Sequence, residues 1–143
     1  MTQEEKKDLL LRDLCARLPY GVKVKLGDNP NIFDLEYRIK FAVMYGDSDK
    51  LEDILDIINI KPYLFPLSSL TEEQRNNISK LLIDTQNEFS PYGELNMKGC
   101  DNLFICSVKQ SNALINYCLT NHLDINGLIE KGLALDATGL NIY

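Results

Sequence analysis

The sequence predicts an α+β fold: an N-terminal helix, a small antiparallel β-sheet of about three strands, and C-terminal helices packed on the sheet. Three observations predict it. A capping box near the N-terminus precedes apolar residues at helical spacing. Apolar and polar residues then alternate in two segments between residues 22 and 43, as in strands. Two further helix-start signals, at Thr71 and Ser107, lie in the second half of the chain.

Length and composition predict one soluble domain over residues 1–143. The 143 residues are 45% hydrophobic and 25% charged, which is ordinary for a globular protein. Residues 1–66 form the half with the first helix and the sheet, and residues 67–143 form the helical half. No stretch approaches the ~20 apolar residues of a membrane span. The charged start, Met1 to Lys7, is not a secretory signal, so we expect a cytoplasmic location and no membrane.

The first helix is predicted over residues 3–18. Thr2 and Glu5 have the spacing of a capping box, and Pro19 with Gly21 ends the segment. Its apolar residues share one helical face, so this face is expected in the core, with Cys15 as a small core residue. The residues of this face are Leu10, Leu11, Leu14, Cys15 and Leu18.

Two strands are predicted next, over residues 22–26 and 33–43, with a turn at 27–31. Apolar and polar residues alternate in both segments. The second segment exceeds the usual strand length, so we expect a bend or break within it. Residues 50–60 fit a helix by spacing and a strand by isoleucine content. We favour a strand or a short mixed segment there.

Residues 60–74 are predicted to connect the sheet to the helical half. Pro62 and Pro66 donate no backbone hydrogen bond, so we expect them to stop the sheet. Thr71 and Gln74 then have capping-box spacing for a helix.

The C-terminal half is predicted to contain a helix pair over residues 108–121 and 125–131. Ser107 has the spacing of a helix start, and Asp124 is expected to cap the second, short helix. Gly132 is expected to end that second helix.

Three aromatic residues are candidates for binding: Tyr63, Phe65 and Tyr92. They lie in or beside proline-containing turns, where a rigid backbone presents an aromatic ring at low entropic cost. The alternative interpretation is that these rings only close the core.

No metal or cofactor is expected, but one cluster is an alternative zinc site: Cys100, Cys106, Cys118 and His122. Thiolates and imidazole are suitable zinc ligands, and Cys118 and His122 are four residues apart on a predicted helix. Five residues separate Cys100 from Cys106, which is more than the usual finger spacing. The competing interpretation is two loop cysteines, a core cysteine and a surface histidine.

The sequence predicts no enzyme. His122 is the only histidine, and the chain has no glycine-rich phosphate loop, Walker pattern or nucleophile elbow. The net charge of −6 argues against direct binding to nucleic acid. The predicted C-terminal helix pair has helix-turn-helix proportions, but its second helix carries Lys131 as its single cation.

Three segments, Leu9–Val22, Lys61–Glu73 and His122–Leu135, resemble a family of small uncharacterised proteins. That family occurs in Bacteroides-type gut bacteria, their phages and their mobile elements. The resemblance transfers no functional residue, but it implies an accessory protein that acts by binding. The expected partner is a host protein or a small nucleotide-type ligand, bound in an anti-defence role, and a homo-oligomer is a candidate assembly. The alternative is a zinc-stabilised, nucleic-acid-associated regulator that uses the C-terminal helix pair.

Overall fold

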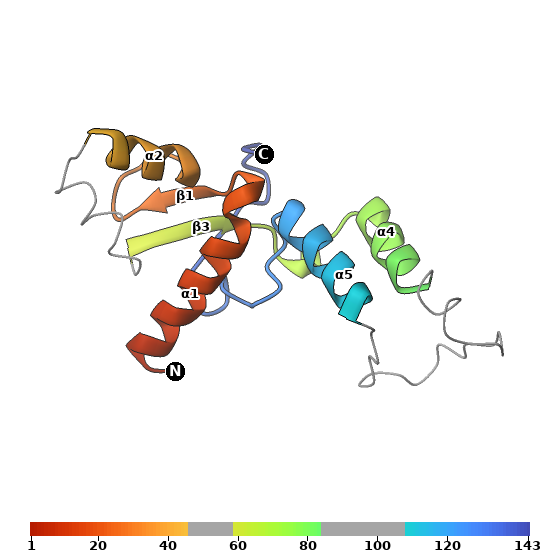
Figure 1. Cartoon of the computed structure of the whole chain (residues 1–143). Coiled ribbons are helices and arrows are strands. Elements are labelled where there is room, and N and C mark those ends of the chain that lie inside the picture. Colours follow the sequence, from red (N-terminus) through yellow and green to blue (C-terminus); the bar gives the residue numbers. More distant parts are fainter. Residues whose placement is uncertain (46–58, 84–107) are drawn as a thin grey trace. The chain divides into compact units, whose positions relative to one another are not determined.

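The computed structural model describes residues 1–45, 59–83 and 108–143 (Figure 1). They form two compact units. The first unit contains Met1–Ser69 together with Leu119–Tyr143, and the second contains Leu70–Cys118. Helices and a small sheet are both present, and the chain begins with a helix, so the predicted α+β class is confirmed.

Helix α1 spans Gln3–Arg17 and begins at the predicted capping box. The amide of Thr2 donates to Glu5 Oε2 at 2.6 Å, and the amide of Glu5 donates to Thr2 Oγ1 at 3.2 Å. A short 3₁₀ helix, η1 (Leu18–Tyr20), follows.

The buried face of α1 differs from the predicted one. It consists of Leu10, Asp13, Leu14 and Arg17. Cys15 is exposed, so its predicted place in the core is wrong. The face is rotated because two charged residues are buried as a pair beside the leucines, and Cys15 consequently points to solvent.

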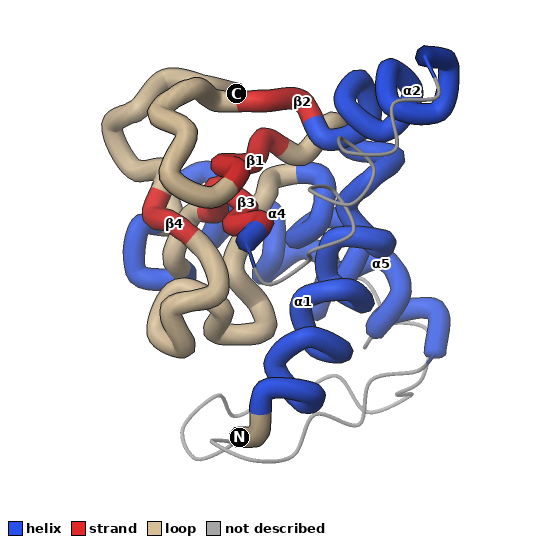
Figure 2. Tube along the Cα trace, turned by 90° about the vertical axis from the view of Figure 1, so that its left-hand side faces the viewer, coloured by secondary structure: helices blue, strands red, loops and turns tan. Residues whose placement is uncertain are grey.

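The sheet has four strands in the order β2-β1-β3-β4 (Figure 2). Its outer strand β2 and neighbour β1 are antiparallel, as are β1 and β3, whereas β3 and β4 are parallel. The predicted antiparallel sheet of about three strands is therefore a mixed sheet of four, because a C-terminal segment returns to its edge. The strands are β1 (Lys23–Leu26), β2 (Phe33–Asp34), β3 (Ile60–Leu64) and β4 (Leu135–Asp136).

The segment around Pro62 is the inner strand β3, so the prediction of a connector that stops the sheet is wrong for this proline. Leu64 O accepts a hydrogen bond from Ala137 N at 2.8 Å, which places the backbone groups of Leu64 on the β4 side. Backbone groups alternate sides along a strand, so Pro62 also faces that side. Strand β4 pairs at Tyr63 and Leu64, and the missing N–H of Pro62 lies beyond that pairing.

The long strand predicted over residues 33–43 is also wrong beyond Asp34. Leu35–Tyr45 form helix α2. Asp34 Oδ1 accepts from Tyr37 N at 3.1 Å, which satisfies one free amide of the first helical turn. Lys40 also pairs with Glu36, four residues earlier. A run of alternating apolar residues places every second one four positions apart, and this spacing also fits a helical face.

The core of the first unit lies between α1, the sheet and the C-terminal turns. Helix α1 crosses one face of the sheet (Figure 1). Apolar side chains from all three parts meet there, and burial of such side chains is the main favourable term in folding. The buried members are Leu10, Leu14, Val22, Val24, Leu35, Ile60, Leu64, Leu128, Leu133 and Ala134.

The second unit contains helix α4 (Glu72–Ile83) and most of helix α5 (Val108–Thr120). The predicted capping box at Thr71 is confirmed. Thr71 N donates to Gln74 Oε1 at 3.0 Å, and Gln74 N donates to Thr71 Oγ1 at 3.2 Å. The helix predicted from Ser107 is confirmed as α5.

The short helix predicted over residues 125–131 does not form, because that segment consists of turns. The C-terminal helix pair proposed for a nucleic-acid-associated regulator is therefore missing its second member. Most of the ambiguous segment 50–60 lies outside the described residues, and Ile60 begins β3.

Candidate functional site

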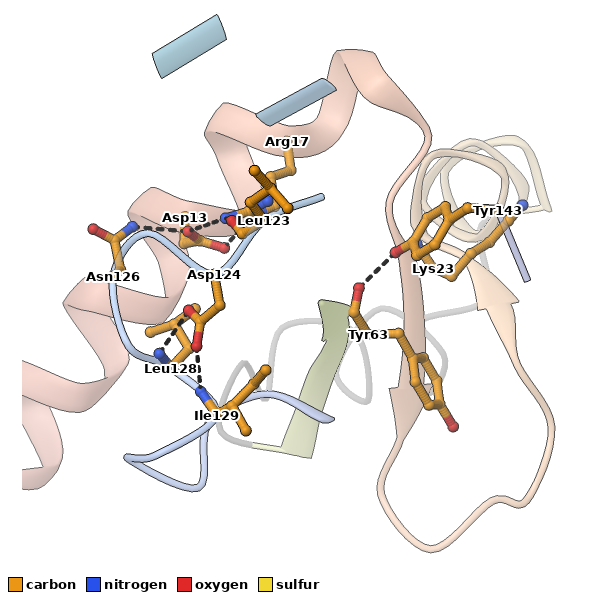
Figure 3. A network of polar contacts seen from close by, with 10 residues as sticks. All are labelled: Asp13, Arg17, Lys23, Tyr63, Leu123, Asp124, Asn126, Leu128, Ile129 and Tyr143. Atoms are coloured by element: carbon orange, nitrogen blue, oxygen red, sulfur yellow. Dashed lines mark hydrogen bonds and ion pairs between the residues drawn. The ribbon is translucent and has the colours of Figure 1, made fainter. Parts of the chain in front are cut away.

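A buried ion pair on α1 holds the C-terminal turn in place (Figure 3). Arg17 Nε donates to Asp13 Oδ2 at 2.7 Å, and both side chains have no exposed surface. Arg17 Nη2 also donates to the carbonyl of Leu123 at 2.7 Å. Asn126 Nδ2 donates to Asp13 Oδ1 at 2.8 Å. The ion pair is thus hydrogen-bonded to the C-terminal turn at two residues, Leu123 and Asn126.

The carboxylate of Asp124 organises the next turn. Its two oxygens accept hydrogen bonds from Leu128 N at 2.8 Å and Ile129 N at 2.9 Å (Figure 3). The side chain therefore caps amides as predicted, although a turn follows it instead of a helix. Gly132 adopts φ +70°, a conformation that favours glycine.

Backbone hydrogen bonds attach this turn to β3. Phe65 N donates to His122 O at 2.9 Å, and Asp124 N donates to Phe65 O at 2.9 Å. His122 itself has φ +54°, which is unusual for a residue other than glycine. These contacts fix the backbone of His122 beside the end of the sheet.

The ladder between β1 and β3 predicts a hydrogen bond at its end. Gly27 N donates to Asn59 O at 2.8 Å. Four residues further along, in the same register, Lys23 faces Tyr63. Bonded pairs repeat every two residues in an antiparallel ladder, so Lys23 N is expected to donate directly to Tyr63 O.

The hydroxyl of Tyr143 takes the place of that direct bond (Figure 3). It accepts from Lys23 N at 3.1 Å and donates to Tyr63 O at 2.7 Å. One phenol oxygen thus bridges a backbone donor and a backbone acceptor on neighbouring strands. We call Lys23, Tyr63, Phe65, His122 and Tyr143 the sheet-end site.

The ring of Tyr143 stacks on the ring of His122. Their centroids are 3.7 Å apart with an interplanar angle of 17°, and the ring of Phe65 lies 5.8 Å from that of Tyr143 at 56°. Only 6% of His122 is exposed. Its Nδ1 is buried and has no hydrogen-bond partner among the described residues. The sheet-end site therefore combines a planar stacking surface with two backbone hydrogen-bonding groups.

The electrostatics keep the ring pair uncharged at neutral pH. Burial, followed by the positive charges of Arg17 and Lys23, lowers the pKa of His122 to about 4. Burial raises the pKa of Tyr143 to about 12, although 41% of the residue is exposed. The tyrosine hydroxyl therefore keeps its proton at neutral pH and donates a hydrogen bond to Tyr63 O.

A salt bridge on the neighbouring strand fixes the side chain of Lys23. Its Nζ lies 3.1 Å from Asp34 Oδ2, with each side chain about one-third exposed. The pKa of Asp34 is lowered, first by the hydrogen bond from Tyr37 N and then by Lys23. Asp34 thus serves both the start of α2 and the edge of the sheet-end site.

The structure brings together two of the three predicted binding aromatics. The ring of Phe65 lies against Tyr143, as described above. Tyr63 contributes its carbonyl instead of its ring, and its own phenol points away from Tyr143 (Figure 3). Tyr92 lies outside the described residues.

Both described members of the alternative zinc cluster, Cys118 and His122, are buried. Cys118 is buried, in agreement with its interpretation as a core cysteine. His122 is buried against Tyr143, so its interpretation as a surface histidine is wrong. Cys100 and Cys106 lie outside the described residues. In the part of the chain that the structure describes, no group of three or more His, Cys, Asp or Glu side chains could hold a metal ion.

Sequence reasoning missed three residues that organise the site: Asp13, Arg17 and Tyr143. The first two carried a usable signal, because opposite charges four apart share the face of Leu10 and Leu14. Tyr143 carried none, because its partner Lys23 is 120 residues away in sequence.

A second surface feature lies on α2. Three large apolar side chains are strongly exposed there: Tyr37 at 65%, Val43 at 67% and Met44 at 78%. The same helix contributes to an apolar pocket of about 330 Å³, which is lined by Leu18, Pro19, Glu36, Ile39 and Lys40. We call this combination the α2 surface.

No family model, curated protein or solved structure matches this chain. The kinship with proteins of gut bacteria and their phages therefore stays a prediction. Within residues 1–45, 59–83 and 108–143, none of the helices has the length and apolar character needed to cross a membrane.

Proposed function

We propose that this chain is a non-enzymatic binding protein that holds a small planar ligand of the nucleotide-base type at the sheet-end site. The observation that carries the proposal is the bridge at Tyr143. Lys23 N and Tyr63 O are held apart and are joined by an atom that both accepts and donates a hydrogen bond. A ring that presents an acceptor and a donor next to each other has the chemistry to satisfy both groups.

Nucleobases have this chemistry on their Watson–Crick edges. Uracil, for example, presents a carbonyl acceptor beside its N3–H donor, so the carbonyl pairs with Lys23 N–H and the N–H with Tyr63 O. The flat face of the base then stacks on the His122 ring, as the Tyr143 ring does at 3.7 Å. Stacking of a base on an aromatic side chain contributes about 1–3 kcal/mol in single-stranded nucleic-acid complexes.

Both cations near the site already have a carboxylate partner: Arg17 is paired with Asp13, and Lys23 with Asp34. Arg17 and Lys23 both act electrostatically on His122, and His122 stays neutral at pH 7. The overall charge of −6 disfavours a long polyanion. These features argue against a nucleic-acid strand and favour a nucleoside or a single nucleotide.

The test is titration of the ¹⁵N-labelled full chain with uridine and with 3-methyluridine. Methylation at N3 removes the donor and leaves the ring almost unchanged. We expect uridine to shift the Lys23 amide resonance and to bind at least tenfold more tightly than 3-methyluridine, by analogy with the loss of one buried hydrogen bond.

Two variants of one residue provide the matched control. Lys23→Pro removes the backbone N–H at the first residue of a strand, where proline is tolerated. Lys23→Ala removes only the side chain. We expect the proline variant to lose uridine binding and the alanine variant to retain most of it. Equal binding of uridine and 3-methyluridine, or no response at Lys23, contradicts the proposal.

The genomic setting implied by the sequence resemblance gives this activity a role. A phage or mobile-element accessory protein that sequesters a nucleotide signal would reduce a host defence response. Measurement of a nucleotide second messenger in infected cells, with and without the chain, tests this role.

The α2 surface supports a second candidate function, the binding of a host protein. Several exposed apolar side chains on one helix are typical of protein interfaces, and the apolar pocket on the same helix can accept one apolar side chain. A partner captured by the wild-type chain should be lost with Val43→Asp/Met44→Asp and retained with Leu11→Asp, which alters an exposed leucine on α1. Concentration-dependent sedimentation of the chain alone would identify the partner as a second copy.

A further inference from the structure

We infer that Tyr143 is a built-in competitor for the sheet-end site, carried by a strap of residues 138–143 that lifts when a ligand binds. This inference rests on the proposed function, because it concerns how the same site is controlled. The phenol of Tyr143 occupies both backbone groups that the ligand needs, and its ring occupies the face of His122. Tyr143 and the ligand therefore exclude each other.

The strap is held at its two ends. Before it, Ala137 is fully buried, and its amide donates to Leu64 O at 2.8 Å. At its far end, Tyr143 makes the hydroxyl bridge and the two ring contacts. Among the described contacts, the hydrogen bonds in between are local: Thr138 N to Asp136 Oδ1 at 2.8 Å, and Leu140 N to Ala137 O at 3.1 Å.

The middle of the strap is poorly anchored. Leu140 is 46% exposed, and residues 138–141 are all exposed. Gly139 and Asn141 adopt φ of +79° and +47°, so the chain reverses sharply there. Asparagine tolerates this conformation better than most residues. The strap can consequently detach at Tyr143 while Ala137 keeps its place in the core.

Because Tyr143 competes for the site within the same chain, it lowers the apparent affinity for a ligand. A ligand that needs the open state binds with an affinity reduced by the fraction of molecules that are open. A tyrosine held by two hydrogen bonds and a ring stack keeps that fraction small. Removal of the tyrosine is therefore expected to tighten ligand binding by about 10- to 30-fold, as population-shift arithmetic requires for an open fraction of a few per cent.

The first experiment tests whether the vacated site accepts an aromatic ring with a hydroxyl. Tyr143→Ala is expected to have a lower Tm than the wild-type chain, and p-cresol is expected to restore several degrees in a concentration-dependent way. Toluene has the same ring and methyl group without the hydroxyl, and should restore much less. The wild-type chain should respond to neither compound, because its own tyrosine fills the site.

The second experiment measures uridine affinity in wild type, Tyr143→Ala and Tyr143→Phe by calorimetry. Tyr143→Phe retains the stacking ring without the bridging hydroxyl, and it tests the inference even if Tyr143→Ala folds poorly. We expect affinity to rise in the order wild type, Tyr143→Phe, Tyr143→Ala. Tyr37→Ala, which removes an exposed tyrosine on α2, should match the wild type.

The outcomes separate this inference from the proposed function. Uridine that binds wild type and Tyr143→Ala equally well overturns the competitor and leaves the proposed function standing. A p-cresol response without uridine binding in either protein overturns the proposed function and supports a site that takes an aryl hydroxyl. No p-cresol response and no gain in uridine affinity overturns the inference.

Discussion

The Asp13–Arg17 pair on α1 and Tyr143 of the strap both hold C-terminal segments of the first unit in place, but they differ in burial and in charge. Each donates a hydrogen bond to a backbone carbonyl: Arg17 to Leu123 and Tyr143 to Tyr63, both at 2.7 Å. Arg17 is fully buried and paired with the carboxylate of Asp13, whereas 41% of Tyr143 is exposed and its raised pKa keeps the hydroxyl neutral. The first contact is thus sealed from water, and the second lies at the surface.

This difference determines which contact can open. Breaking a buried ion pair leaves a charge without its partner in an interior that solvates it poorly. A phenol hydroxyl can exchange its partners for water at little net cost, since a hydrogen bond contributes only about 0.5–1.5 kcal/mol to stability. The α1 pair therefore acts as a permanent anchor, and Tyr143 as a removable one.

The largest effect is expected from Arg17→Leu. This change leaves the carboxylate of Asp13 buried without its cation and Leu123 O without its donor. We expect the free energy of unfolding to fall by about 3–5 kcal/mol, the usual cost of breaking a buried pair on one side. Urea denaturation followed by circular dichroism measures the change.

The same helix supplies the matched control. Arg12 and Asp8 form a pair with the same four-residue spacing at 2.9 Å, but their side chains are 78% and 58% exposed. Arg12→Leu is expected to cost less than about 1 kcal/mol, as surface pairs do. Similar losses in the two variants would contradict the distinction between a permanent anchor and a surface contact.

The helix starts and the first strand show which parts of the fold the local sequence can predict. Both capping boxes, at Thr2 and Thr71, were predicted because each involves residues three positions apart whose side chains meet only at a helix start. The strand at 22–26 was predicted because apolar residues alternate with lysines. The alternation after Asp34 fits both a strand and a helix, and the cap that Asp34 provides for the amide of Tyr37 favours the helix.

The parts that were missed depend on partners distant in sequence. Pro62 is compatible with an inner strand only because β4, over 70 residues later, stops pairing before it. The site is the part least predictable from local sequence. Tyr143 replaces one direct hydrogen bond between β1 and β3, and no local pattern reveals that replacement. Of the two predicted binding aromatics that the structure describes, Phe65 has its ring in the site, and the proline beside it was the local signal that predicted it.

Protonation of His122 is expected to make the free energy of unfolding depend on pH. The folded pKa is about 4 and the ordinary value is 6.5, so between these values the unfolded chain binds a proton that the folded chain refuses. Stability is therefore complete above pH 6.5 and falls as the pH drops toward 4. The loss is at most about 3 kcal/mol, from 1.36 kcal/mol per pH unit.

This window can be assigned to one residue, because His122 is the only histidine. The pKa values of Asp34 and Asp136 are lowered, so the stability that these carboxylates contribute is lost only at more acidic pH. Urea denaturation at several pH values from 7 to 4.5 measures the slope. His122→Asn keeps a residue that tolerates φ +54° and removes the titration, so its stability should be nearly constant in this window. A wild-type profile as flat as that of the variant would show that the imidazole is not buried.

The smallest effect is expected from Tyr143→Phe, which removes only the bridging hydroxyl. Lys23 N and Tyr63 O then either close to the direct bond that the register allows or bind water. Because both groups regain a partner, the cost should be about 1 kcal/mol or less. Tyr63→Phe is the control, since Tyr63 contributes its carbonyl to the bridge and that carbonyl remains.

Hydrogen exchange of the Lys23 amide in Tyr143→Phe shows how the two backbone groups respond. Exchange slows if the direct bond forms and accelerates if water enters. A loss of 3 kcal/mol or more would place Tyr143 with Arg17 as a permanent anchor, and the strap could not then act as a competitor that a ligand displaces.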